Sequence, residues 1–136
     1  NIKQEIFNKV KNHLLTQNEK SCKGDSTDRI VTSRYRLRKD DRLLKCGIGC
    51  LIPDEEYNHQ MEGRGVGRLD LEIQSDWCVE GDKLLYNSLN KIIPLTEHNC
   101  LFLSALQRVH DDNEVSQWES RLDDVQRALE DGAYDE

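Results

Sequence analysis

The chain has 136 residues, of which 36% are hydrophobic and 33% are charged, and its formal net charge is −7. This length supports one hydrophobic core and excludes two domains of ordinary size, so we predict a single domain over residues 1–136. No apolar run approaches the length of a membrane span and the first residues lack the layout of a secretory signal, so we expect a soluble, cytoplasmic protein without a membrane partner.

The charge is unevenly distributed along the chain. Residues 1–45 carry a net charge of +6, whereas residues 46–136 carry −13. The acidic part repels the phosphate backbone of nucleic acids, so direct binding to nucleic acid is not expected. This charge favours a basic protein, or a nucleic-acid-binding protein, as the partner. The alternative is that the charged residues form a solvated layer that only keeps the protein soluble.

The chain begins with the pattern of an amphipathic helix. Apolar residues recur at intervals of four from Ile2 to Leu14, and Asn1 precedes them as a helix cap. The segment 17–28 is polar apart from Cys22 and is predicted to be a mobile loop. Residues 30–37 and 43–48 are rich in β-branched and apolar types on either side of a charged turn, which predicts a β-hairpin.

The remaining elements are predicted to be mostly helical. A short helix is predicted to begin at Pro53, and a glycine-containing surface loop is predicted to follow over 57–67. Strict alternation over 69–74 predicts an edge strand. Three further helices are predicted: one near 82–93, one that begins after a cap at Thr96, and one over 115–129. The acidic tail 131–136 is expected to fray. We therefore predict an α+β fold, in which three or four α-helices cover a small antiparallel sheet made of the hairpin and the edge strand.

Two sets of residues have side chains suited to catalysis or metal binding. The first set would form the site of a hydrolase or transferase. In it, Cys46 or Cys50 would be the thiolate nucleophile, His110 the general base and Asp111 the group that orients the base. Cys46, Cys50, His98 and Cys100 are suitable zinc ligands by type, but their spacing is not that of a structural zinc motif. Reduced, buried thiols and a structural histidine explain both sets, so we favour a non-enzymatic protein without a cofactor.

Two further patterns have weaker functional interpretations. Gly63, Gly65 and Gly67 resemble a phosphate-binding loop without the Lys-Ser/Thr that would complete a nucleotide fingerprint, so a small-ligand or nucleotide-sequestering module is a second alternative. The segment 34–45 combines several basic residues with Tyr35, and this combination is also typical of proteins that bind single-stranded nucleic acid. Charged hairpins also prevent sheets from pairing edge to edge, and we favour that interpretation.

The chain contains the strings KCGIGCLIPDEEY at 45–57, MEG at 61–63 and LQRVHD at 106–111, followed by Trp118. With these strings it resembles a family of small uncharacterised proteins of tailed bacteriophages and prophages. The similar order of elements extends over nearly the whole chain. The resemblance implies an accessory phage protein without an assigned enzymatic activity, and proteins of this kind often bind and inhibit a host protein. Residues 33–37 keep the Tyr-Arg of the family's Tyr-Arg-Gly turn but lack its glycine and the family's additional cysteine, which weakens any metal site built on the hairpin.

The expected function is therefore non-enzymatic binding of a host protein in the bacterial cytoplasm, as an anti-defence or host-takeover inhibitor. The sequence leaves the identity of the partner and the oligomeric state open. An acidic helical surface is expected to make the contact. The carboxylates expected there are Asp54, Glu55, Glu56, Glu62, Glu119, Asp123 and Asp124.

Overall fold

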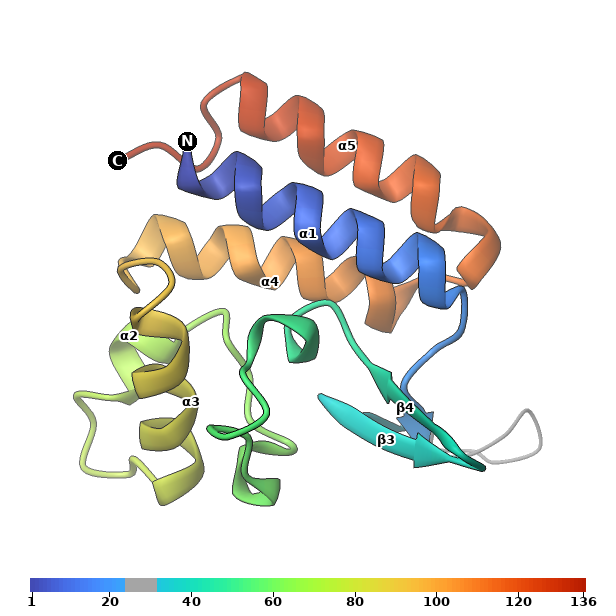
Figure 1. Cartoon of the computed structure of the whole chain (residues 1–136). Helices are drawn as coiled ribbons and strands as arrows, with labels where there is room; N and C mark the ends of the chain where they lie inside the picture. Colours follow the sequence, from blue (N-terminus) through green and yellow to red (C-terminus); the bar gives the residue numbers. More distant parts are fainter. Residues whose placement is uncertain (24–31) are drawn as a thin grey trace.

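A layer of three long helices forms one side of the molecule in the computed structural model, which describes residues 1–23 and 32–136 (Figure 1). These helices are α1 (Ile2–Gln17), α4 (Glu97–Asp112) and α5 (Trp118–Glu130), and each contacts the other two. The Asn1 side chain accepts a hydrogen bond from the Lys3 amide at 2.9 Å, and the Thr96 hydroxyl accepts one from the Asn99 amide at 3.3 Å. Both predicted helix caps are therefore confirmed.

Two small antiparallel pairs of strands lie beneath one end of this layer. Strands β3 (Arg36–Lys39) and β4 (Arg42–Lys45) form the hairpin, and its turn uses Asp40 in a left-handed backbone conformation, with φ 56°. Strands β1 (Cys22–Lys23) and β2 (Thr32–Ser33) form the second pair. The hairpin strands are shorter than predicted. Residues 24–31, which include the second part of the loop predicted at 17–28 and the start of the predicted first strand, lie outside the described residues.

Two predicted elements differ from the structure. Residues 69–74 do not form an edge strand, because α2 (Leu69–Glu72) occupies this segment and the Ile73 amide donates to the Leu69 carbonyl at 3.1 Å. The same apolar residues satisfy a helical spacing, with Leu69 and Ile73 four positions apart. No helix follows Pro53 either. Residues 54–56 form a single turn, and the short 3₁₀-helices η1 (Gly49–Leu51) and η2 (His59–Met61) lie on either side of it.

Helix α3 (Glu80–Asn90) completes the other end of the molecule, where it contacts α2 and η2. A third 3₁₀-helix, η3 (Val115–Gln117), leads into α5. The buried apolar side chains form one cluster, to which α1, α3, α4, α5, Tyr35 and the segment 46–69 all contribute. The fold is a small α+β fold, as predicted, with five α-helices rather than three or four in the described residues. None of the helices described is long and apolar enough to cross a membrane.

The two chain ends lie close together (Figure 1). The Lys3 ammonium donates to the carbonyl of Tyr134 at 2.7 Å, and the Tyr134 ring lies 5.3 Å from the ring of Phe102. We expected the tail at 131–136 to fray, but these contacts hold it against α1 and α4. Tyr134 is the reason, because its ring covers apolar surface that an acidic tail without it would leave exposed.

Candidate functional site

The cysteine-containing string forms a tight connection between the hairpin and the helices, and we call residues 46–62 the junction. Cys46 is fully buried, and the Gly49 amide donates to its sulfur at 3.2 Å. The Cys50 thiol donates to the Gly47 carbonyl, also at 3.2 Å. A Cβ atom at Gly49 would overlap the carbonyl oxygen of Tyr35, so only glycine allows the junction to approach the hairpin this closely. The string is therefore an architectural element.

Both junction cysteines are held as neutral thiols. Burial raises the pKa of the Cys46 thiol to about 12, and burial raises that of Cys50 to about 11. A nucleophilic cysteine needs a thiolate at neutral pH, and such residues have a lowered pKa. This environment gives no support to the thiolate role considered for either cysteine.

His110 uses both of its ring nitrogens inside the fold. The Ser21 amide donates to Nε2 at 2.8 Å, so Nε2 is an acceptor and the proton of the neutral ring is on Nδ1, which donates to Asp111 at 2.7 Å. The Gln107 amide group also donates to the Asp111 carboxylate, at 3.2 Å. The ring is fully buried and stacks on Trp118 at 5.5 Å between centroids. His110 has no nitrogen left to take a proton from a substrate.

The residues considered for zinc do not form a metal site. Cys100 is buried on the first turn of α4, with its pKa raised to about 11 chiefly by burial, whereas Cys46 and Cys50 belong to the junction. His98 lies two residues before Cys100, so the helix turns it to a different side. Within residues 1–23 and 32–136, no three His, Cys, Asp or Glu side chains are arranged to hold a metal ion.

The acidic residues of the junction are largely paired within the molecule. Asp54 lies 2.7 Å from the Arg36 guanidinium and 3.5 Å from the Lys45 ammonium, and both lower its pKa. Glu56 lies 2.9 Å from the ammonium of Lys91, and the hydrogen bond from Lys91 lowers its pKa. Only Glu55 in this group is exposed without an ion pair among the described residues.

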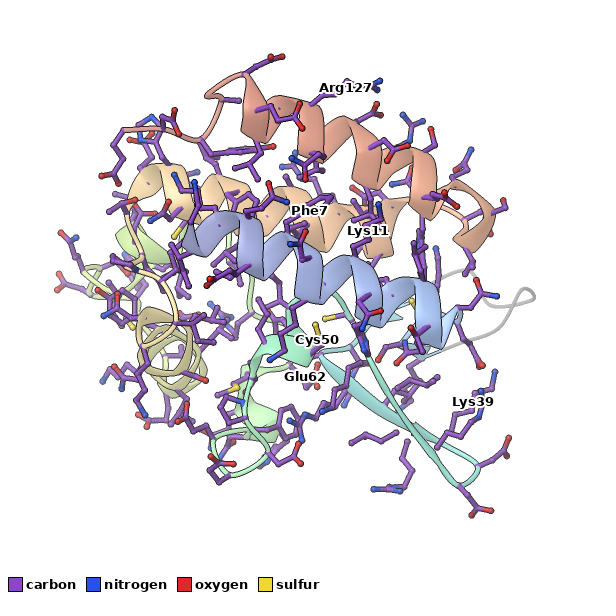
Figure 2. The ribbon with its side chains drawn as sticks, turned by 45° about the horizontal axis from the view of Figure 1, so that its top comes forward. Phe7, Lys11, Lys39, Cys50, Glu62 and Arg127 are labelled. Carbon is purple, nitrogen blue, oxygen red and sulfur yellow. The ribbon has the colours of Figure 1, made fainter. Side chains whose placement is uncertain are left out.

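Glu62 is a structural carboxylate that ties the hairpin to η2 (Figure 2). Its side chain is only 9% exposed. It accepts hydrogen bonds from the backbone amides of Tyr35 at 2.8 Å and Arg36 at 3.1 Å, and from the Tyr57 hydroxyl at 2.6 Å. The Arg34 guanidinium lies 3.6 Å away. Glu62 is therefore fully used by the fold and does not contribute to an exposed acidic surface.

The acidic residues of α5 lie on the other side of the molecule from the junction. Asp124 pairs with Arg121 at 3.4 Å and with Arg127, whereas Glu119 and Asp123 are exposed and have no ion pair within the described part of the chain. Helices α1 and α4 separate α5 from the junction (Figure 1). The seven carboxylates predicted to form one binding surface are thus divided between two places.

The basic residues of the hairpin are also mostly paired. Glu19, just after α1, accepts from the Lys39 ammonium at 2.9 Å and from the Arg42 guanidinium at 2.6 Å. Tyr35, the aromatic residue considered for base stacking, is buried. A base cannot stack on a buried ring, so the hairpin does not have the exposed aromatic and basic surface of a single-strand binder.

The glycine loop, residues 63–67, borders a cavity of about 310 Å³ between α4 and the hairpin. Its lining carries both signs of charge, with Arg64 and Arg108 on one hand and Asp111 on the other. Arg64 is committed to Asp82, to which it donates at 2.8 and 3.2 Å, and its carbonyl accepts a hydrogen bond from the Tyr35 hydroxyl. The carboxylate in the wall opposes a phosphate group, so the phosphate-binding interpretation of this loop is not favoured.

The surface that the fold leaves open lies between α2 and α3, at the end of the molecule opposite the hairpin (Figure 1). Trp77 is 85% exposed, and Leu71 and Val79 on either side of it are 54% and 44% exposed. A tryptophan is usually among the most buried residues of a domain, as Trp118 is here. We call the following side chains the Trp77 surface: Leu71, Glu72, Asp76, Trp77, Val79 and Glu80.

The backbone around Trp77 is anchored on both sides. The Trp77 amide donates to the Ser75 hydroxyl at 3.2 Å, and the Val79 amide donates to the Asp82 carboxylate at 3.4 Å. Asp82 is buried and receives the two hydrogen bonds from Arg64. Gly81 brings α3 against the Gln60 carbonyl, where any Cβ atom would overlap. The loop therefore presents Trp77 from a fixed backbone.

The chain segment around Trp77 is acidic. Residues 69–82 contain five acidic residues and no lysine or arginine, and they are flanked by Arg68 and Lys83. Glu72, Asp76 and Glu80 are exposed, and no ion pair neutralises them within the described part of the chain. An exposed tryptophan among unpaired carboxylates makes few contacts within this fold, and it differs in this respect from every candidate in the junction except Glu55.

Trp77 was not among the residues singled out from the sequence, although a signal is present there. Trp118 shares a three- and four-residue spacing with Leu122 and Val125, which marks it as a core residue. Trp77 belongs to no such period and is preceded by Ser75 and Asp76. An aromatic residue outside any apolar pattern therefore indicated a side chain that the core does not take up.

The chain was also compared with known proteins. Comparison with protein-family models, with curated proteins and with solved structures gave no match.

Proposed function

We propose that the chain is a non-enzymatic accessory protein of a phage, and that it binds a basic protein of the bacterial host through the Trp77 surface. The observation that carries this proposal is the 85% exposure of Trp77 on an anchored loop. Tryptophan is strongly enriched among the residues that dominate binding energy at protein interfaces, because it buries a large area at a small cost in side-chain entropy. The resemblance to phage proteins is the reason for naming a bacterial host.

The charge of the Trp77 surface determines the kind of partner. A complementary surface would hold an apolar pocket for the indole ring, rimmed by lysine or arginine side chains that face Glu72, Asp76 and Glu80. Rim charges of this kind accelerate association and set specificity more than they add affinity. Helix α5 lies across α1 and α4 from α2 and α3 (Figure 1), so its acidic residues face away from this pocket but add to the negative field that attracts a basic protein.

The proposed consequence of binding is inhibition. Many basic protein surfaces bind nucleic acid through contacts with phosphate groups. An acidic protein seated on such a surface excludes the nucleic acid by occupying its place and by repulsion. By blocking a nucleic-acid-binding host protein in this way, the Trp77 surface would serve an anti-defence or host-takeover role.

A matched set of variants tests the proposal. The chain and its variants would be immobilised and used to capture proteins from a bacterial host lysate, and the captured protein would then be purified for affinity measurements. Trp77→Ala is expected to weaken binding at least 30-fold, since hot-spot tryptophans contribute about 2 kcal/mol or more. Leu43→Ala is the control. Leu43 is also an exposed, large apolar side chain, at 39%, but it lies on the hairpin at the opposite end of the molecule (Figure 1).

A direct measurement follows the tryptophan itself. The chain has two tryptophans, and only Trp77 is open to a collisional quencher such as acrylamide. Binding of the purified partner is expected to remove most of the quenching by covering Trp77. Retention of binding by Trp77→Ala, or unchanged quenching in the complex, would show that the partner uses another surface.

A further inference from the structure

A second open site lies between α1 and strand β4, at the hairpin end of the molecule. It is a groove of about 490 Å³, larger than the cavity beside the glycine loop. We call it the α1–β4 groove, and the side chains used below are Lys9, Asn12, His13 and Thr16 of α1, Lys45 of β4 and Cys50 of η1. We propose that this groove binds a phosphate dianion, either free or as the phosphate group of a small monoester.

The helix dictates which side chains meet in the groove. Lys9, Asn12, His13 and Thr16 are separated by three and four residues, so they lie on one face of α1. Lys11 is two positions from Lys9, which places it on a different face, and it does not line the groove. The sequence therefore supplies an ammonium, an amide, an imidazole and a hydroxyl along a single stripe.

Strand β4 is fixed against this stripe through its backbone. The Lys45 amide donates to the Gln17 side chain at 3.0 Å, and the Lys45 carbonyl accepts from Gln17 Nε2 and from His13 Nε2, each at 2.9 Å. These three bonds hold the backbone of Lys45 against α1. The two elements that carry the donors are thereby fixed before any ligand arrives, which reduces the entropy that binding would cost.

The side chains that line the groove carry a net positive charge, which comes from Lys9 and Lys45. No carboxylate is among those lining residues, in contrast to the cavity beside the glycine loop, which has Asp111 in its wall. Lys9 has no ion pair with any described residue. Lys45 has one, with Asp54 at 3.5 Å, but Asp54 is exposed and lies closer to Arg36. Lys9 is therefore available to an anion, and Lys45 would exchange Asp54 for the anion while Asp54 keeps Arg36 at 2.7 Å.

His13 has one ring nitrogen left for a ligand. A carbonyl only accepts hydrogen bonds, so Nε2 carries a proton and donates to Lys45, while Nδ1 has no partner among the described residues. Burial lowers the pKa of His13, the hydrogen bond to Lys45 raises it, and the charges of Lys45 and Lys9 lower it further. A bound dianion opposes this lowering, because it stabilises the protonated ring.

Phosphate matches this set of groups better than a simple carboxylate does. It carries about two negative charges near neutral pH and three strong acceptor oxygens. The Lys9 and Lys45 ammonium groups supply the charge, and Asn12 and Thr16 supply further donors. The His13 ring becomes a further donor when the bound dianion favours its protonation at Nδ1. The groove also leaves room for an organic group, next to the exposed Leu43 and the Cys50 thiol.

Thermal unfolding of the intact chain tests the proposal, with inorganic phosphate, adenosine 5′-monophosphate and sodium chloride compared at equal ionic strength and pH 7. A saturable rise of Tm is expected with at least one of the two phosphates and not with chloride. Lys9→Gln is expected to weaken binding about tenfold, as loss of one charge-assisted hydrogen bond does. Lys11→Gln is the matched control, because it removes the same charge from another face and should bind as the wild type does.

The two phosphates distinguish the possible sources of the ligand. Tighter binding of the nucleotide would identify a phosphomonoester with an organic group in the groove, whereas equal or tighter binding of inorganic phosphate would identify the free anion. The His13 imidazole provides a second readout by NMR. Its signals should shift with saturation and its pKa should rise, while exposed His59 should not change. No saturable effect of either phosphate, or equal weakening by Lys9→Gln and Lys11→Gln, would overturn the proposal.

Discussion

The junction and the Trp77 surface use the same kinds of residue in opposite ways. In the junction, the Glu62 carboxylate accepts hydrogen bonds from two backbone amides and a tyrosine hydroxyl, and it lies next to the Arg34 guanidinium. Around Trp77, three carboxylates have no ion pair among the described residues. A side chain whose hydrogen bonds are all used by the fold cannot bind a ligand without breaking them. Binding is therefore expected where the fold leaves such groups free.

His110 and His13 repeat this contrast within the helical layer. His110 uses Nδ1 and Nε2 within the protein, whereas His13 uses Nε2 and has no partner for Nδ1 among the described residues. The sequence gives both histidines similar helical surroundings. Their different hydrogen bonds are what assign one to the core and the other to a candidate site.

The largest effect is expected from Gly49→Ala in the junction. The added Cβ atom would overlap the Tyr35 carbonyl, and both groups are backbone or bonded directly to it, so neither can rotate away. Displacing the junction from the hairpin should reduce the free energy of unfolding by about 3 kcal/mol or more. Urea denaturation followed by circular dichroism measures this loss.

Gly65→Ala is the control for that substitution. A Cβ atom at Gly65 meets nothing within 4 Å, and its backbone is not in the left-handed region. The free energy of unfolding should stay the same or rise by about 0.4–1 kcal/mol, because alanine restricts the unfolded chain. A Gly49→Ala protein as stable as Gly65→Ala would contradict the architectural role of the junction.

An intermediate effect is expected from Glu62→Gln. The amide group would present an N–H donor where the carboxylate now accepts, so at least one backbone donor at Tyr35 or Arg36 would lose its partner. Leaving a buried donor unsatisfied should reduce the free energy of unfolding by about 2 kcal/mol. The same change at exposed Glu55 should alter it by less than about 0.5 kcal/mol. Equal effects at the two positions would mean that Glu62 is not the structural carboxylate described here.

Much of the helical framework could be predicted from the sequence, because long amphipathic periods and caps are local signals. The spacing from Ile2 to Leu14 and the Thr96 cap led to α1 and α4 with nearly correct limits. Short segments could not be resolved in this way. The alternation at 69–74 fits a strand and a helix equally well over so few residues, and packing against α3 and α4 decides for α2.

The candidate site was not predictable from charge and cysteine content. The acidic residues at 54–62 were chosen because they cluster in the sequence, but the basic residues that neutralise them, Arg36, Lys45 and Lys91, are distant along the chain. Pairing of this kind is a tertiary property. The exposure of Trp77 is equally tertiary, because it follows from where α2 and α3 place the loop between them.

The smallest effect on stability is expected from Trp77→Ala, and this is the sharpest test of the comparison. An indole that is 85% exposed makes few contacts, so its removal should change the free energy of unfolding by less than about 0.5 kcal/mol. Urea denaturation of this variant should therefore overlay the wild-type curve, while binding of the partner is lost. A loss of more than about 1 kcal/mol would mean that the indole packs against the protein in solution. Weaker binding by this variant would then report a damaged fold, and the Trp77 surface would belong with the junction as part of the architecture.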